Sequence, residues 1–476
     1  MPGLRRSVSS ARGLATATSG RAHQLAVARL VASYRAVPAT ATVRLAKKTS
    51  NLFRVRRPTA VPGLDVTGLA GVLSIDPAAR TADVAGMCTY ETLVAATLPH
   101  GLSPLVVPQL KTITVGGAVT GLGIESASFR NGLVHESVLE MDILTGAGEM
   151  VTASPNNEHA DLLFGFPNSF GTLGYATRIR IQLESVEPYV ALRHLRFTDL
   201  NRLTATLEDI VATGAHDGIG VDYLDGVVFT ADECYLTLGL QTADPGPTSD
   251  YTRQQIYYRS IRERTTDRLT IHDYLWRWDT DWFWCSRAFG AQQVVVRRLW
   301  PRRLRRSSFY WKLVALEQKY GIADRIEKLH SRPPLERVVQ DVEIPLEGTA
   351  DFLAWFLDTV PIEPLWLCPL RTRPPSGQGA PRQWPLYPLG ADRTYVNIGF
   401  WSVVPSRPGG PVGATNRLIE DRVTESHGHK SLYSDAFYTH EDFDRLYGGT
   451  KYAELKETYD PESRLLDLHA KVVGRR

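Results

Sequence analysis

Two hydrophobic periods alternate along the first 185 residues. Apolar residues three or four positions apart within 23–37 predict an amphipathic helix. Its expected apolar face comprises Leu25, Ala28, Leu30, Val31 and Tyr34. From residue 71 the pattern predicts strands and helices in turn. The strands are expected at 71–76, 80–87, 138–154 (a pair) and 176–183, with helices at 90–101 and 161–171. This order predicts an α+β domain.

The pattern changes after residue 187. Residues 188–430 combine longer helices and strands with many aromatic residues, and Pro-rich loops interrupt them. Residues 431–476 return to helical spacing, with Phe443, Tyr447 and Leu455 on one face. We therefore expect a second α+β domain at 188–430 and a helical C-terminal segment at 431–476.

Composition places the chain among globular proteins. Hydrophobic residues make up 43% and charged residues 22%, and no apolar run reaches the length of a bilayer-spanning helix. The four cysteines are scattered without a CxxC pair, which argues against a zinc knuckle or a disulfide scaffold. A reducing, cytoplasmic location is expected.

The amino-terminal segment is strongly basic. Twelve Lys or Arg and no acidic residue precede Asp65, although the whole chain carries a net charge of only +3. We expect residues 1–22 to form a basic flexible tail. Their Arg-rich, Ser-rich composition is also typical of a transit peptide, so targeting to an organelle is the alternative.

A cluster of glycines occupies residues 114–132, TVGGAVTGLGIESASFRNG. Glycines let a ligand approach the main chain, and successive amide N–H groups form a concavity that suits phosphate. Neither a P-loop nor a Rossmann signature is present. A second cluster, Gly171 to Gly174, lies between a helix and a strand of the same domain. A tight structural turn is the alternative explanation for either cluster.

Three segments in order, TVGGAVTGLGIESASFRNG, VLEMDILTGAGEMVTAS and FGTLGYATRIRI, resemble the FAD-binding domain of the vanillyl-alcohol oxidase and p-cresol methylhydroxylase superfamily. VVPQLKTITVGGAVTGLGIESAS, VVQDVEIPL, EPLWLCPL and SHGHKSLYSDAFYTHEDF are similar, in the same order, to the delta-24 sterol reductase (seladin/diminuto) family. The resemblance extends from about residue 43 to 459. It implies a two-subdomain FAD-binding domain of the p-cresol methylhydroxylase type at 23–187, an α+β substrate (cap) domain at 188–430 and a C-terminal segment that returns to the flavin side.

The resemblance also implies which residues contact FAD. The implied contacts are Thr114, Val115, Gly116, Gly117, Gly121, Gly123, Ile124, Glu125, Ser126, Gly171, Thr172 and Gly174. For Glu125 a structural carboxylate that caps local amides is the alternative.

The first pyrophosphate loop of this superfamily usually contains glycine, and often a His or Cys that is bonded to the flavin. The equivalent stretch here, RLAKKTSNLF, contains none of these residues. We therefore expect noncovalent FAD, with Lys47, Lys48, Thr49, Ser50 and Asn51 supplying charge and hydrogen-bond donors. A solvated basic loop is the alternative. No nicotinamide site is evident, so any NADPH would act as a transient reductant.

Reduction of an isolated C=C bond needs a hydride on one carbon and a proton on the other, so an acid must face the flavin. The candidates for this acid are Tyr395, Asn397, His427, His429, Tyr433 and Asp435. Histidine is favoured because its ordinary pKa lies near neutrality. Each candidate could equally be a hydrogen-bonded structural residue. A metal site built from His427, His429 and His440 lacks a fixed acidic ligand, so none is predicted.

Two further stretches point to a lipid. WRWDTDWFW at 276–284 predicts either core packing or one wall of a wide apolar pocket. Residues 297–306 contain six arginines, which suit a solvated face or peripheral contact with anionic membrane lipids. Arginines interleaved with aromatic residues could also bind nucleic acid, but nothing else in the chain supports that function.

The leading hypothesis is an FAD-dependent enzyme that reduces, or in reverse forms, a C=C bond in a sterol-like or isoprenoid lipid. The alternative chemistry is oxidation of an alcohol such as a 2-hydroxy acid or a sugar. A third hypothesis, a lipid-associated binding protein without catalysis, rests on the glycine-poor first loop.

Overall fold

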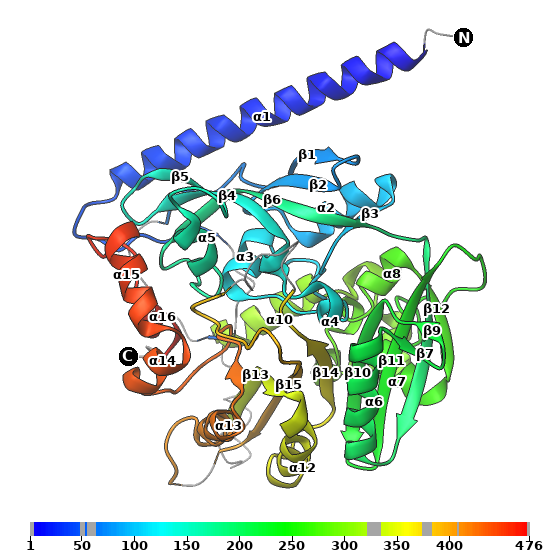
Figure 1. Cartoon of the computed structure of the whole chain (residues 1–476). Helices are drawn as coiled ribbons and strands as arrows, with labels where there is room; N and C mark the ends of the chain where they lie inside the picture. Colours follow the sequence, from blue (N-terminus) through cyan, green and yellow to red (C-terminus); the bar gives the residue numbers. More distant parts are fainter. Residues whose placement is uncertain are drawn as a thin grey trace.

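The computed structural model describes residues 4–47, 53–54, 63–320, 335–373, 383–406 and 409–473, without the side chains of 4–19, 315 and 317–320. Two antiparallel sheets form its framework (Figure 1). The sequence-based expectation of an α+β fold is confirmed.

The first sheet has the strand order β1-β2-β6-β4-β5, with β3 also paired to β6. Its strands are β1 (Val72–Asp76), β2 (Thr81–Ala85), β3 (Leu102–Pro104), β4 (Val138–Thr145), β5 (Met150–Ala153) and β6 (Gly174–Ser185). The helices of this part are α2 (Tyr90–Thr97), α3 (Val115–Gly121), α4 (Ser128–Asn131) and α5 (Ala160–Gly165). The alternating sequence of β6 explains its central place, because Ile179, Ile181 and Leu183 all point into the core.

Helix α1 (Leu4–Ala36) packs its C-terminal half on this domain and extends past β1 (Figure 1). Of its described side chains, those of Ala26, Leu30 and Tyr34 are buried, whereas Leu25 and Ala28, both expected on the apolar face, are exposed. Residues 4–22, expected as a flexible tail, are helical. The stretch is rich in good helix formers, and no proline interrupts it before Pro38.

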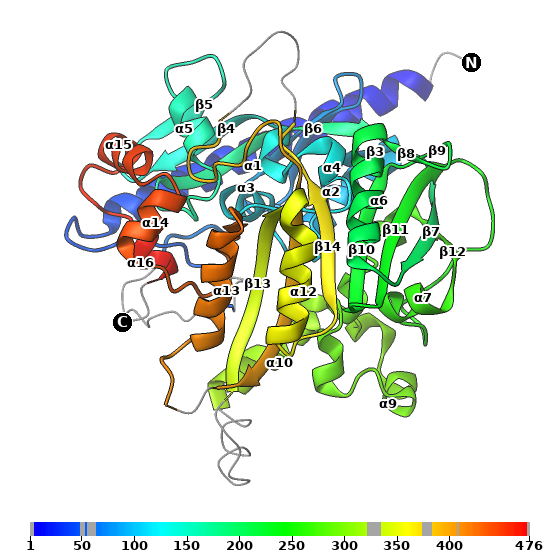
Figure 2. The ribbon, with the colours of Figure 1, turned by 60° about the horizontal axis from the view of Figure 1, so that its bottom comes forward.

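The second sheet contains eight strands in the order β12-β7-β11-β10-β14-β15-β13-β16. Their bounds are β7 (Tyr189–Phe197), β10 (Tyr223–Thr230), β11 (Glu233–Thr242), β12 (Thr266–Thr270), β13 (Leu335–Pro345), β14 (Leu365–Leu370), β15 (Tyr395–Pro405) and β16 (His429–Lys430). Helices α6 (Leu200–Thr213), α12 (Thr349–Thr359) and α13 (Ala414–Glu425) lie on one face of it (Figure 2).

The period-two alternation of the central strands separates the two faces of this sheet. Val396, Ile398 and Phe400 of β15 pack under the helices, as do Leu365 and Leu367 of β14. The intervening positions, among them Asn397, Trp401 and Trp366, face the first domain. The face opposite the helices therefore forms one wall of the space between the two domains.

The connection from β12 to β13 contains α8 (Ile271–Leu275), α9 (Val294–Leu299) and α10 (Ser307–Tyr320). After β16 the chain returns to the first domain as α14 (His440–Leu446), α15 (Gly449–Tyr459) and α16 (Leu468–Val472). Lys456 of α15 donates to the Thr172 carbonyl at 2.9 Å, and the amide of Ala147 donates to the Tyr459 carbonyl at 2.9 Å. In the described residues, every helix is too short or too polar to cross a bilayer.

Candidate active site

A cavity of about 1480 Å³ lies between the glycine segment of the first domain and the aromatic face of the second sheet. This volume exceeds the roughly 300–1,000 Å³ of an ordinary small-molecule pocket. Residues 431–440, which lead into α14, supply a third wall. Segments far apart in the sequence therefore enclose one large space.

The start of the glycine segment is a short helix rather than an open loop. Thr114 caps α3, because its hydroxyl accepts a hydrogen bond from the Gly117 amide at 3.1 Å. A Cβ at Gly116 would lie 2.6 Å from the carbonyl oxygen of Gly86, so this glycine permits close contact between two backbone segments. At Gly117 a Cβ would meet only the Thr114 side chain, and this residue lines the cavity. One glycine thus serves packing and the next leaves room for a ligand.

Eight of the expected cofactor contacts in the two glycine clusters line the cavity. They are Thr114, Gly116, Gly117, Gly121, Gly123, Ile124, Gly171 and Gly174. Gly171 has a φ of +73°, a left-handed conformation that favours glycine. The backbone near both clusters is therefore accessible from the cavity.

Four expected contacts lie outside the cavity lining. Val115 and Ser126 are buried, and the Thr172 hydroxyl donates to the Ser169 carbonyl at 2.8 Å. Glu125 is also buried, and it accepts hydrogen bonds from the Ser126 amide at 2.5 Å and from Arg277 at 2.8 Å. The structure thus places these four residues behind the lining, and the contacts of Glu125 favour its structural role. The sequence could not show this, because Arg277 lies 152 residues away.

Positive charge dominates the cavity lining. Its described basic side chains are Arg44, Lys47, Arg54, Arg417 and Lys471, whereas Asp341 is its one described carboxylate. Lys47, an expected cofactor contact, lines the cavity. Lys48, Thr49, Ser50 and Asn51, the other expected contacts of that loop, lie outside the described residues. The lining suits an anionic group.

Aromatic rings form one end of the cavity. Phe53 contacts Trp282, Trp311 and Tyr433, with ring centroids 5.9, 5.2 and 5.8 Å away. Phe283 packs on Trp401 at 4.3 Å. Of the WRWDTDWFW stretch, only Trp282 and Phe283 line the cavity, and the other tryptophans of that stretch are core residues.

Backbone strain is concentrated at this cavity. The described chain has nine non-glycine residues with positive φ, and four of them, Leu122, Phe170, Trp282 and Phe283, are lining residues. Such conformations cost about 1–3 kcal/mol each and persist where the surrounding structure imposes them. Trp282 and Phe283 are consecutive, with φ of +47° and +59°. The strained backbone at these two residues lowers the stability of the fold but orients both rings toward the cavity.

A polar group is set among the rings. Asp341 lies on β13, and the Tyr433 hydroxyl donates a hydrogen bond to its carboxylate. Asn397 Nδ2 donates to Asp341 Oδ1 at 3.4 Å, and Trp401 Nε1 donates to the Tyr433 oxygen at 2.8 Å. Burial raises the pKa of Asp341 to about 7. Desolvation, then the neighbouring Asp341 charge, raises the pKa of Tyr433 well above its ordinary value. This group can hold and move a proton near neutral pH.

Two of the sequence-based catalytic candidates belong to this group, Tyr433 and Asn397. Asp341 was missed, although it stands two residues before Glu343 in the largely apolar stretch VVQDVEIP. Carboxylates at alternate positions of a strand share one face, and that local signal was available. Glu343 itself is buried, and its carboxylate accepts hydrogen bonds from the hydroxyls of Tyr387 and Ser431.

The other candidates lie elsewhere. His427 is exposed at the end of α13, with φ of +55°, and His429 lies outside the cavity lining, where burial lowers its pKa to about 4. The Tyr395 hydroxyl is turned to the Gly390 amide, 3.1 Å away. Asp435 uses its carbonyl to accept from Lys430 at 2.6 Å. Neither of these two histidines lines the cavity, and the lowered pKa of His429 disfavours it as a proton donor.

The structure does not group His440 with His427 and His429. Instead His440 lies near Asp467 and His469, with one ligand atom of each within 4.8 Å of the others. His440 and His469 line the cavity, and the two rings are 4.5 Å apart.

Comparison with known proteins places this geometry in context. A family model described as an FAD binding domain matches residues 23–154. The chain is 24% identical over 421 residues to Delta(24)-sterol reductase of Homo sapiens, an alignment of 85% of this chain and 76% of that protein. It is 24% identical over 456 residues to Delta(24)-sterol reductase of Arabidopsis thaliana, with 86% and 76% covered. It is 36% identical over 151 residues to Cytokinin dehydrogenase 6 of Oryza sativa subsp. japonica, with 32% and 28% covered.

Proposed function

We propose that this chain, an FAD-dependent oxidoreductase with a p-cresol methylhydroxylase-type FAD-binding domain, reduces or in reverse forms a C=C bond in a sterol-like or isoprenoid lipid. The observation that carries the proposal is the Asp341–Tyr433 hydrogen bond inside a wall of aromatic rings. An apolar, ring-lined end suits a hydrocarbon skeleton, and the polar group supplies what the chemistry needs from the protein.

The residues of the cavity fit FAD. Its diphosphate is anionic, and the lining offers basic side chains together with the glycine wall at Gly117. Among the buried polar atoms of the lining that have no hydrogen-bond partner in the described structure are the Trp311 Nε1 donor and the Asn397 Oδ1 acceptor. Buried polar groups are normally paired, so a polar ligand is expected beside them. We assign the diphosphate of FAD to the basic and glycine-rich lining, and its isoalloxazine ring to the aromatic end.

FAD supplies hydride transfer when it is bound. The protein must add a proton to the second carbon of the double bond, and the Tyr433 hydroxyl is the proposed donor. Asp341 accepts a hydrogen bond from that hydroxyl, and its raised pKa lets it return a proton to the phenolic oxygen. Trp401 holds the same oxygen from the other side, which limits its rotation. In the reverse direction the two residues accept the proton.

The aromatic wall has a second task in this proposal. Trp282 and Phe283 exclude water from the face on which the double bond lies, so that the proton comes only from Tyr433. Noncovalent attachment of the flavin is part of the proposal. Acid precipitation should leave FAD in the supernatant. Flavin that stays with the denatured chain would point to a bond to His440 or His469, the histidines of the described lining.

Oxidation of an alcohol is the second candidate, and one observation favours it. An aspartate with a pKa of about 7 can serve as a general base for a hydroxyl. Asp341 would then act as the acceptor of the alcohol proton rather than as a proton reservoir.

One experiment separates the two. The purified enzyme is photoreduced without oxygen and mixed with unsaturated sterols or isoprenoids, and reoxidation of the flavin is followed by its absorbance. Reoxidation by these lipids, lost in Tyr433→Phe, supports the proposal. Reduction of the oxidised flavin by 2-hydroxy acids or sugars, with no response to the lipids, would replace it with the alternative. A protein that retains no flavin would favour the binding-protein hypothesis.

The proposed cellular place is the cytoplasm, at a membrane that holds the substrate. NADPH is the proposed reductant, acting only transiently. Stopped-flow mixing of the oxidised enzyme with NADPH tests that part, because bleaching of the flavin would be expected within the turnover time.

A further inference from the structure

Helix α9 exposes apolar side chains that nothing in the described structure covers. Val294, Val295 and Leu299 are 78%, 70% and 79% exposed. They are three of the four most exposed large apolar side chains in the described residues. Figure 2 shows α9 at the lower right of the molecule, below α7 (Tyr257–Glu263). Isolated exposed apolar residues are ordinary, but three on one short helix form a patch that water solvates poorly.

Arginines surround this patch. Arg298, Arg302 and Arg303 are exposed, and no Asp or Glu occurs between Asp281 and Glu317. Positive charge beside apolar side chains is the composition of a surface that lies on anionic lipid. We name Val294, Val295, Leu299, Arg298, Arg302 and Arg303 the α9 patch.

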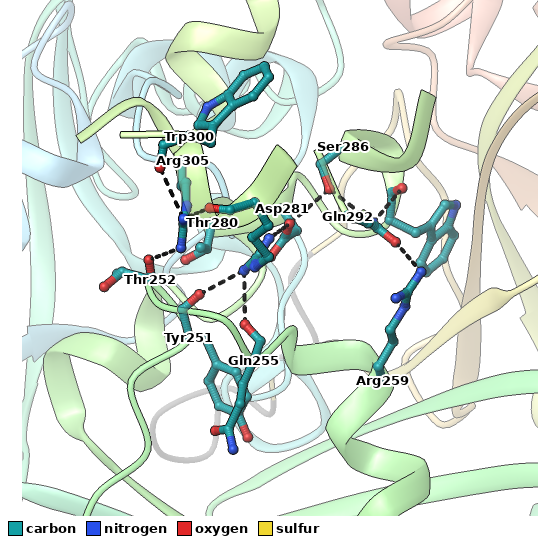
Figure 3. Close-up of polar contacts among 12 residues, drawn as sticks. Tyr251, Thr252, Gln255, Arg259, Thr280, Asp281, Ser286, Gln292, Trp300 and Arg305 are labelled. Atoms are coloured by element: carbon teal, nitrogen blue, oxygen red, sulfur yellow. Dashed lines mark hydrogen bonds and ion pairs between the residues drawn. The ribbon is translucent and has the colours of Figure 1, made fainter. Parts of the chain in front are cut away.

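Two other arginines of this run, Arg297 and Arg305, hold the patch in place. Arg297 is buried, and its Nη1 and Nη2 lie 2.6 and 3.0 Å from the two carboxylate oxygens of Asp281. It also donates to the carbonyls of Tyr251 and Gln255, at 3.1 and 2.8 Å. Figure 3 labels three of its partners, Tyr251, Gln255 and Asp281. The interpretation of all six arginines as one solvated or lipid-binding face is therefore wrong for Arg297.

Arg305 is a second buried anchor. Its guanidinium donates to the Thr252 carbonyl at 2.6 Å and to the Trp300 carbonyl at 3.0 Å (Figure 3). A helix of six residues is not stable alone, so these contacts fix its orientation. The fold thus uses two buried charges to present an apolar surface to the outside.

The patch is continuous with the aromatic end of the cavity. Trp300, which follows α9 directly, packs on Phe309 and Tyr310 of α10, with centroids 5.8 and 6.4 Å away. The next residue, Trp311, lines the cavity. Packed aromatic rings therefore connect α9 to the helix that supplies Trp311 to the cavity lining.

The geometry points to a peripheral membrane-docking site at the α9 patch, whose occupant is the surface of an anionic phospholipid bilayer. Val294, Val295 and Leu299 enter the acyl boundary, and Arg298, Arg302 and Arg303 contact the phosphates. This docking adds a route for the substrate to the proposed function but does not depend on it.

Cosedimentation of the full-length holoenzyme with vesicles tests the proposal. Binding to phosphatidylcholine vesicles with 30% phosphatidylserine is expected to exceed binding to phosphatidylcholine alone and to weaken in high salt. Leu299→Glu, and separately Arg302→Glu with Arg303→Glu, are expected to reduce partitioning at least about fivefold for each charge altered. Turnover of a detergent-solubilised substrate should stay at the wild-type level in both variants.

Matched controls carry the same changes elsewhere. Val403→Glu replaces an apolar side chain that is 54% exposed on β15, and Arg202→Glu reverses an exposed charge on α6. Both should bind vesicles like the wild type. The proposal is overturned if the α9 variants bind as well as these controls, or if sedimentation velocity shows that the same variants break a self-associated form. Failure of catalysis with intact vesicle binding would instead count against the proposed function alone.

Discussion

One nitrogen of Arg277 ties the glycine segment to the second domain through Glu125, with Nη2 and Oε1 2.8 Å apart. The same nitrogen donates to Asp225 of β10, also at 2.8 Å. All three side chains are buried, and Trp278 and Trp366 donate to Asp225 as well. This buried group of charges fixes one wall of the cavity against the other.

Removal of the Arg277 guanidinium should therefore destabilise the protein strongly. Arg277→Met leaves two carboxylates buried without their cation, which typically costs ~3–5 kcal/mol of unfolding free energy. Urea denaturation of the FAD-free protein measures the loss. The control is Arg445→Met, which breaks an ion pair with Asp442 whose arginine is 56% exposed, and it should cost less than ~1 kcal/mol. Equal losses in both variants would contradict the structural role.

Neighbouring glycines should respond differently to alanine. Gly116→Ala places a methyl against the Gly86 carbonyl, so the fold should lose stability. Gly117→Ala gains helix propensity of up to ~1 kcal/mol, which offsets the displaced Thr114 cap, and the methyl faces the cavity. We expect near-normal thermal stability for Gly117→Ala but FAD affinity about tenfold weaker, measured by flavin fluorescence. Loss of stability without loss of affinity at Gly117 would exclude it from the cofactor wall.

Replacement of Tyr433 should slow the chemical step. Tyr433→Phe removes the proposed proton donor, so kcat for double-bond reduction should fall by about 10²–10⁴ while KM changes little. Tyr395→Phe is the matched control, because its hydroxyl is bonded to Gly390 outside the cavity. Steady-state kinetics of both variants give the comparison. A similar kcat in Tyr433→Phe and the wild type would remove Tyr433 from the mechanism.

The pH dependence of turnover should reveal the role of Asp341. If it is the proton reservoir for reduction, kcat should decline as pH rises above about 7, where burial has placed its pKa. If it is the base for an alcohol, the rate should instead increase through the same range. In Asp341→Asn, neither the fall nor the rise of kcat around pH 7 should remain. A profile that is flat between pH 6 and 8 would disprove both roles.

Ionisation of Asp341 should also lower the stability of the fold as pH rises from 3.8 to about 7. Its pKa is raised from 3.8 in the unfolded chain to about 7, so the folded protein holds this proton more tightly. The stabilisation from that proton is complete below 3.8 and is lost as pH rises through 7. Asp341→Asn has no such loss, so its thermal midpoint relative to the wild type should increase from pH 4 to pH 8. An unchanged difference across that range would contradict the raised pKa.

The sequence predicted what local patterns determine. The strands of the first sheet follow from alternation within β2, β4 and β6, and Gly171 was recognisable as part of a turn between a helix and a strand. The C-terminal helices follow in the same way from the spacing of Phe443, Tyr447 and Leu455, all of which are buried.

Long-range contacts determined the rest. Asp341, and not Glu343, faces the cavity. The Glu343 carboxylate instead accepts hydrogen bonds from Tyr387 and Ser431, which are distant in the sequence. His429 was an attractive acid by residue type, yet its burial is set by the sheet it joins. Similarly, Arg297 could not be told from Arg298 until Asp281 was placed beside it.

The alternation of β13, β14 and β15 has an evolutionary consequence. Alternate positions of these strands have different neighbours. One set packs against the covering helices, and the other faces the cavity. Mutations at Asn397 or Trp401 can therefore alter which molecules are accepted while the helix-facing half of each strand keeps the domain folded. A lineage with this architecture can diversify its substrates without rebuilding its scaffold.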